Sequence, residues 1–181
     1  MGNRIGSVVE FQTESRIATL TRPSNTTPYD VGDCISAVTT NAYLTFDDVA
    51  NKGPSRLTGV ISSATIWSNA NVASKPEIEA WIFHTPIASV ADNSAFAPSD
   101  AEMLTLVGVI QFPAADFFIG KADAGITGNC VCQVPSIGLP YQVNALGATP
   151  TVAFYCQLVA RSAYIPVSGE IFTMRLMLTL D

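Results

Sequence analysis

The chain carries very little charge. Asp, Glu, Lys and Arg make up 13% of its 181 residues, against about a quarter in an average soluble domain. The 15 acidic and 9 basic residues leave a net charge of −6, and the Lys and Arg residues form no cluster. A nucleic-acid-binding protein needs clustered basic side chains to replace the counterions of the phosphate backbone. The sequence therefore argues against nucleic acid as a partner.

Long apolar runs are missing as well. No segment reaches the roughly 18 consecutive apolar residues of a membrane-spanning helix. Residues 1–6 lack the apolar stretch and the small-residue cleavage site of a secretory signal. We therefore expect a protein that is made in the cytoplasm and does not enter a membrane.

Histidine occurs once, as His84. Any Ser-His-Asp or Cys-His catalytic arrangement would have to use this residue, and no nucleophile-elbow, zincin or dinucleotide-binding motif accompanies it. Its position at the end of an apolar stretch is more typical of a packing or rim residue. The sequence favours a protein that is not an enzyme and has no cofactor. The competing hypothesis is a hydrolase with a pocket around His84 and acidic partners.

Four cysteines are present, at positions 34, 130, 132 and 156. A reducing cytoplasm favours free, buried thiols over disulfides. One residue separates Cys130 from Cys132, which places both sulfurs on the same face of a strand. A zinc knuckle needs a gap of about two to four residues, so we expect no bound metal.

Two stretches organise the chain, residues 57–67 and residues 78–84. The first is rich in β-branched residues. The second is apolar on both alternating faces, which predicts a strand lying deep between two layers; a short buried helix is the alternative. The most regular alternation runs through residues 151–161 and 170–180, two strands that we expect to be joined by a hairpin-like turn.

Shorter apolar stretches predict further strands. They lie at residues 16–20, 41–46, 104–112, 130–134 and 141–143. Ser99 and Glu102 match a helical capping box. Strands separated by turn residues, without a long helix, predict an all-β fold: a two-sheet sandwich of the jelly-roll type with at most one or two short helical turns. We expect residues 1–20 to form an N-terminal arm with the first strand and residues 21–181 a single β-sandwich domain.

Three motifs carry a resemblance to a known group of proteins. They are TRPSNTTPYDVGD at residues 21–33, DNSAF at 92–96 and ARSAYIP at 160–166. In this order, before a final apolar strand, they resemble small virion structural proteins of tailed bacteriophages. The first motif is the most specific. The resemblance implies a component of the phage particle. With the extended character of the first motif, it makes Arg22, Pro23 and Tyr29 candidate contacts with the capsid or a neighbouring subunit.

Low charge and the resemblance together favour a capsid decoration or cement protein, located on the virion surface. It would bind the phage major capsid protein and stabilise the shell. A neutral surface rich in Thr and Ser is buried at small desolvation cost, so we expect a homo-oligomer, with a homotrimer as its form. The alternative is a glycan- or receptor-binding module of a phage head or tail fibre, in which Trp67 or Trp81 stacks on a sugar ring. If the chain is not such a module, we expect both tryptophans to pack in the core.

Overall fold

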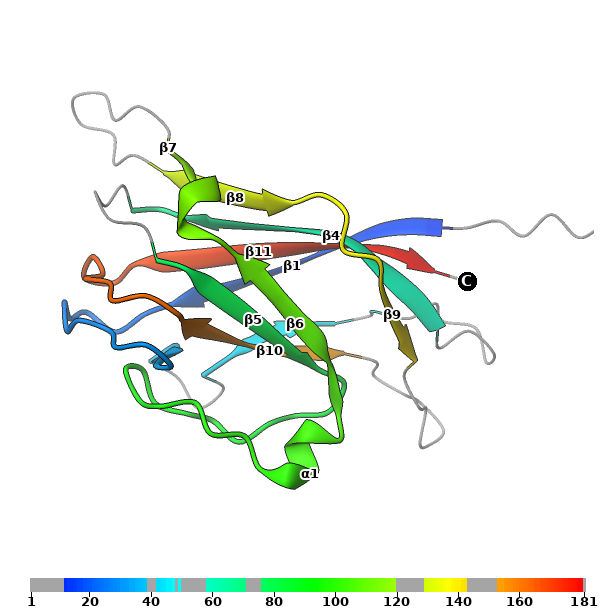
Figure 1. Ribbon diagram of the computed structural model, residues 1–181, viewed down its shortest axis with the longest axis horizontal. Helices are drawn as coiled ribbons and strands as arrows, with labels where there is room; N and C mark the ends of the chain where they lie inside the picture. Colours follow the sequence, from blue (N-terminus) through cyan, green and yellow to red (C-terminus); the bar gives the residue numbers. More distant parts are fainter. Residues whose placement is uncertain are drawn as a thin grey trace, which may run out of the picture.

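Two antiparallel β-sheets packed face to face form the protein in the computed structural model (Figure 1). The structure describes residues 12–38, 42–47, 49, 58–70, 76–119, 129–142 and 153–180. Several ends of the expected strands, and residues 1–11 of the expected N-terminal arm, lie outside these ranges. None of the described helices is long and apolar enough to span a membrane.

The sheet that we call sheet I contains the first and the last described strands. Its strand order is β1-β11-β4-β8-β7, and β9 also pairs with β4. The strands are β1 (Gln12–Thr21), β4 (Thr58–Ser68), β7 (Phe118–Ile119), β8 (Cys130–Val134), β9 (Leu139–Gln142) and β11 (Ile171–Leu180).

The opposite sheet, sheet II, has the strand order β2-β10-β5-β6, and β3 also pairs with β10. Its strands are β2 (Cys34–Ile35), β3 (Leu44–Phe46), β5 (Ile78–Phe83), β6 (Leu106–Phe112) and β10 (Phe154–Ala160). There are two short helices in the described residues. α1 (Asp100–Met103) lies between β5 and β6, and the 3-10 helix η1 (Ala114–Asp116) lies between β6 and β7.

The strands pair in a nested order: the first strand pairs with the last, and strands nearer the middle of the sequence pair with one another. β1 pairs with β11, β2 and β3 pair with β10, β4 pairs with β8 and β9, and β5 pairs with β6. One long antiparallel ribbon, rolled up so that its strands fall into two sheets, gives this pairing, which is that of a jelly roll. The predicted all-β two-sheet sandwich is therefore confirmed, and the strand order makes it a jelly roll.

The connections between strands differ from the sequence prediction. β10 and β11 lie in different sheets, so residues 161–170 cross between the sheets, and the expected hairpin-like turn there is wrong. β4 and β5 are likewise in different sheets. Alternation of apolar side chains identifies a strand, but it carries no information about which distant strand pairs with it. The two-residue strands β2 and β7 are too short to show alternation and were not predicted.

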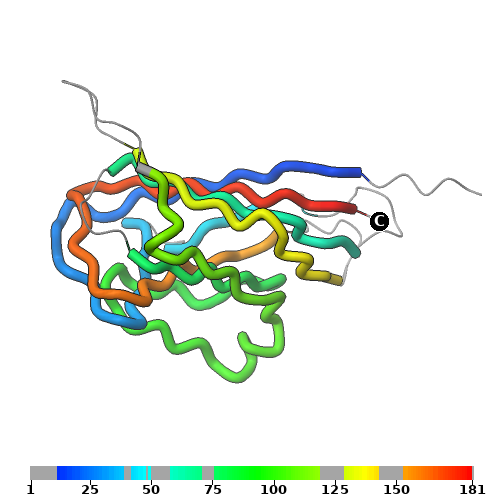
Figure 2. Tube along the Cα trace, turned by 45° about the horizontal axis from the view of Figure 1, so that its top comes forward, coloured from blue at the N-terminus to red at the C-terminus, as the bar shows by residue number. Residues whose placement is uncertain are grey.

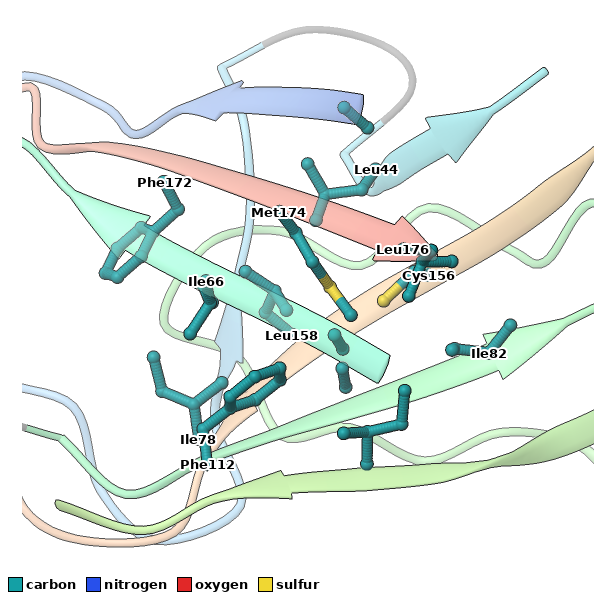
Figure 3. Close-up of a cluster of buried hydrophobic side chains, with 14 of the residues drawn as sticks. Leu44, Ile66, Ile78, Ile82, Phe112, Cys156, Leu158, Phe172, Met174 and Leu176 are labelled. Carbon is teal, nitrogen blue, oxygen red and sulfur yellow. The ribbon is translucent and has the colours of Figure 1, made fainter. Parts of the chain in front are cut away.

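The core lies between the inner faces of the two sheets. β11 supplies every second side chain to it, and β5 and β10 face β11 from sheet II (Figure 3). The side chains of Phe172, Met174, Leu176, Leu178 and Leu180 are all 1% exposed or less. Alternation over ten residues thus predicted correctly which side chains of this strand form the core.

A second layer covers part of the outer face of sheet II. Phe96, in the connection between β5 and α1, packs edge-on against Trp81 at 5.4 Å and Phe83 at 6.4 Å between ring centroids. β5 therefore has apolar contacts on both faces, as its sequence predicts, and the helix alternative for residues 78–84 is wrong. The predicted capping box is also present: Ser99 Oγ accepts the Glu102 N–H at 3.3 Å, and the Glu102 carboxylate accepts the Ser99 N–H at 2.7 Å.

Candidate functional site

The three motifs of the phage resemblance meet at one end of the sandwich. Residues 21–33 connect β1 to β2, residues 92–96 lie between β5 and α1, and residues 160–166 follow β10 (Figure 1). Backbone hydrogen bonds join them: Tyr29 N–H donates to Tyr164 O at 2.9 Å, and Phe96 N–H donates to Gly32 O at 2.9 Å. We call this assembly the motif cluster.

A buried ion pair lies at the centre of the motif cluster. Arg22 Nη2 is 2.9 Å from Asp92 Oδ2, and the two side chains are 0% and 6% exposed. Asp92 Oδ1 also accepts the Tyr29 hydroxyl and the Ser36 N–H, the latter at 3.0 Å. Arg22 donates further to the Tyr29 hydroxyl and to Val167 O, the latter at 3.3 Å. A buried charge is stable only when it is paired and hydrogen-bonded in this way.

A second buried carboxylate extends the network. The rings of Tyr29 and Tyr164 stack at 5.8 Å with an interplanar angle of 2°. The Tyr164 hydroxyl donates to one oxygen of Glu170, and the Ser68 hydroxyl donates to the other. Burial, followed by the neighbouring carboxylates, raises the pKa of both tyrosines far above the ordinary value. Both hydroxyls therefore remain protonated donors at physiological pH.

The central side chains of the motif cluster are buried, whereas Val31 and Ile165 at its surface are each 65% exposed. Arg22 and Tyr29, two of the three predicted contact residues, are 1% and 0% exposed, so their side chains bind within the chain. Pro23, the third, is partly exposed. The sequence singles out the three motifs, but it does not show that they meet in the fold. Asp92, which neutralises the charge of Arg22, lies 70 positions after it in the sequence.

The residues considered for chemistry lie apart from one another. His84 is partly exposed at the end of β5, and its backbone N–H donates to Thr105 O at 3.0 Å. All four cysteines are free and buried, as predicted, and Cys130 and Cys132 share one face of β8. Within the described ranges, no three His, Cys, Asp or Glu residues are placed to hold a metal ion.

The buried thiols predict that alkali destabilises the fold. Burial, assisted by the charges of Asp33 and Asp92, raises the pKa of Cys34 from 9.0 to about 12. Burial also raises the pKa of Cys132 to about 11. A pKa that is higher in the folded state stabilises the protein fully below the unfolded value and is lost as pH rises through the folded value. We expect the urea midpoint to be constant up to about pH 9 and to fall between pH 9 and 12.

The variant Cys34→Ala provides the control for this prediction. It removes one of the titrating groups, so its urea midpoint should fall less between pH 8 and pH 10.5 than that of the unmodified chain, when both are followed by circular dichroism. Equal falls for the two proteins would contradict a role for Cys34.

The outer face of sheet I is the second candidate site, and we call it the open face. Its side chains are those that alternate with the core positions of five strands, and they are mostly hydroxyl-bearing or apolar. They are Thr13, Ser15, Ile17, Thr19 and Thr21 of β1, Ile171, Thr173, Arg175, Met177 and Thr179 of β11, Val60, Ser63, Thr65 and Trp67 of β4, Val131 and Gln133 of β8, and Phe118 of β7. Arg175 is the only charged residue among them.

Both tryptophans lie on outer faces of the sandwich, so the expectation of core packing is wrong. Trp67 is partly exposed in the middle of the open face, between its cross-strand neighbours Thr173 and Val131. Trp81 is partly exposed on sheet II, where its Nε1–H donates to Glu79 at 2.9 Å. Their apolar neighbours in the sequence suggested the core, but the alternation of Trp81 with Ile82 and of Trp67 with Ile66 places the smaller side chains inside.

Comparison with known proteins identifies no relative: no protein-family model matches the chain, and no curated protein matches it in sequence.

Proposed function

We propose that the chain is a structural protein of a tailed-phage virion, a capsid decoration or cement protein that binds the outer capsid surface through the open face and stabilises the shell. The open face carries this proposal, because Arg175 is its only charge. Moving charged groups out of water is costly, whereas Thr, Ser and apolar side chains are buried at small cost. A sheet face of this composition suits a large interface with another protein. The role requires neither catalysis nor a cofactor.

The distribution of acidic residues supports the same orientation. Asp100 and Glu102 belong to α1 on the sheet II side of the molecule (Figure 2), whereas Glu79 on the outer face of sheet II is paired with Arg161 at 2.6 Å. Asp30 and Asp33 lie in the β1–β2 connection. Among the described residues, the open face is thus almost neutral, whereas α1 on the sheet II side is acidic. With the neutral side on the shell, the acidic side faces solvent, where like charge keeps particles apart.

The motif cluster adds rigidity to the proposed binding subunit. It ties the connections that precede β2, precede α1 and follow β10 to one buried ion pair. A preorganised surface loses less conformational entropy on binding than a flexible one. A rigid subunit that binds only the assembled shell stabilises it by mass action.

Thr173→Glu tests the proposal. Thr173 is central in the open face, between Thr19 and Trp67, and a carboxylate there would have to leave water when the shell binds, which is costly. We expect capsids lacking this chain to bind the variant at least about tenfold more weakly than the unmodified protein. Capsids that bind the unmodified protein should rupture at a higher temperature than bare capsids, whereas capsids mixed with the variant should not.

Ala101→Glu is the matched control, because it adds the same carboxylate to α1 on the sheet II side. It should bind capsids and raise the rupture temperature as the unmodified protein does. Cryo-electron microscopy of intact particles should show the chain on the outer face of the capsid lattice. Equal binding by the two variants, or equal rupture temperatures with and without the protein, would contradict the proposal.

One observation favours a second candidate, a glycan- or receptor-binding module of a head or tail fibre. Trp67 is accessible on the open face and has Thr65 and Thr173 beside it. An aromatic ring flanked by hydroxyl groups can stack on a sugar and hydrogen-bond to it. Density for the chain at the tail tip, with quenching of Trp67 fluorescence by host-surface glycans, would support this candidate and contradict the first.

A further inference from the structure

β1 is an edge strand of unusual length. It runs for ten residues and pairs with β11 without a register shift, from Gln12 opposite Leu180 to Thr21 opposite Ile171. No other strand in the described part of the chain pairs with its opposite edge. A long, regular edge strand is a template for pairing with another chain, and proteins usually block it with proline, a bulge or charge. β1 contains neither proline nor glycine, and its register is unbroken; its two charges, Glu14 and Arg16, are opposite in sign and paired with each other.

The first half of β1 extends beyond the core. Its buried positions begin at Ala18, whereas Gln12, Thr13, Ser15 and Ile17 are exposed. Ile17 is 59% exposed although it is β-branched and apolar. Figure 2 shows this end of the strand running past the strands of sheet II. Within the described part of the chain, no strand pairs with this edge, so a second strand can pair with residues 12–18 there.

The charges of β1 select one way of pairing two copies. If a two-fold axis perpendicular to the sheet relates the two copies, one residue of β1 lies opposite the same residue of the second copy, and the axis passes between them. An axis at Ser15 places Glu14 opposite Arg16 of the second copy, and Arg16 opposite its Glu14. An axis at Glu14 or at Arg16 places like charges directly opposite each other, which is destabilising. Among these three neighbouring registers, only the one centred on Ser15 is complementary in charge.

We propose that two copies of the chain pair through β1, antiparallel and with Ser15 opposite Ser15, so that sheet I continues across the dimer. Glu14 and Arg16 already form an ion pair within each chain. In the dimer each of these side chains would lie between two opposite charges, one from its own chain and one from the second copy. Ile17 would gain Thr13 of the second copy as its neighbour. A two-fold contact produces dimers, whereas a homotrimer is expected from the sequence, and the mass in solution distinguishes the two.

Charge reversal tests the pairing. By sedimentation velocity, the unmodified chain should have twice the 19.2 kDa mass of one chain. Glu14→Arg and Arg16→Glu should each raise the dissociation constant of the dimer at least about tenfold. An equimolar mixture of the two variants should dimerise again, because every charge then meets its opposite. Asp100→Arg, which makes the same change in net charge as Glu14→Arg but on α1, should leave the dimer intact.

Cysteine cross-linking tests the register independently of charge. Opposite residues of an antiparallel pair have Cα atoms close enough for a disulfide, so Ser15→Cys should give a covalent dimer on mild oxidation. Thr13→Cys should not, because Thr13 would lie opposite Ile17. The four native thiols are buried and should not interfere. A monomer or trimer in solution, a dimer unaffected by either charge reversal, or equal cross-linking of the two cysteine variants would overturn the proposal.

Discussion

Replacing Asp92 with alanine should lower the free energy of unfolding by about 3–5 kcal/mol, as expected when one partner of a buried ion pair is removed. The substitution leaves the guanidinium of Arg22, whose side chain is 0% exposed, without its counter-ion. It also removes the acceptor of the Tyr29 hydroxyl and of the Ser36 N–H. Urea unfolding followed by circular dichroism measures the loss.

Two further variants separate the ion pair from general effects of substitution. Replacing both partners by apolar residues, as in Arg22→Met with Asp92→Leu, should cost less than Asp92→Ala alone, because no unpaired charge remains buried. Asp100→Ala removes an exposed carboxylate from the first turn of α1 and should cost at most about 1 kcal/mol. A loss below about 1 kcal/mol for Asp92→Ala, which is the range of exposed pairs, would show that the pair does not hold the motif cluster together.

Gly59→Ala should lower the free energy of unfolding by about 2–3 kcal/mol, at the upper end of what one inserted methyl group costs. A Cβ atom at Gly59 would lie 2.7 Å from the backbone O of Thr179 and 2.6 Å from the Tyr141 hydroxyl. Neither neighbour moves easily, because Thr179 pairs with β4 and the Tyr141 hydroxyl donates to Val49 O at 2.7 Å.

Gly108→Ala is the matched comparison. Its Cβ atom would also have a close neighbour, at 2.6 Å, but that neighbour is a terminal methyl group of Leu139. Rotation of this side chain can relieve the contact, so we expect a loss below about 1 kcal/mol. Equal losses for the two variants in urea unfolding would contradict the view that the backbone around Gly59 cannot move.

The alternation of apolar residues predicted the strands and much of the core, but not their arrangement. β11 shows this most clearly, because its five inward side chains follow from the sequence alone. The pairing of β11 with β1 and β4 does not, since these strands are far away in the sequence. The same limit hides the surroundings of Arg22. An arginine in a polar, proline-containing segment is expected to be solvated, and only the folded chain brings Asp92 to it.

The outer faces were harder to predict than the core. Because Trp81 and Ile82 are consecutive in β5, their side chains point to opposite faces, and Trp81 shares its face with Glu79. The sequence does not show that Phe96 covers that face. Likewise, the low charge of the whole chain indicated a covered surface. Only the register of β1, β11 and β4 shows that hydroxyl and apolar side chains gather on one sheet face.

The position of β11 has a consequence for synthesis on the ribosome. It is the last strand to be translated of those described, yet it lies between β1 and β4 and supplies a hydrogen-bonded neighbour to both. While the intervening residues are being added, β1 and β4 have no partner on that side, and their apolar side chains stay exposed or are shielded by chaperones. Sheet I can close only after β11 has left the exit tunnel. We therefore expect sheet I to form only after β11 has been translated, and nascent chains that still lack β11 to be the form most prone to aggregate.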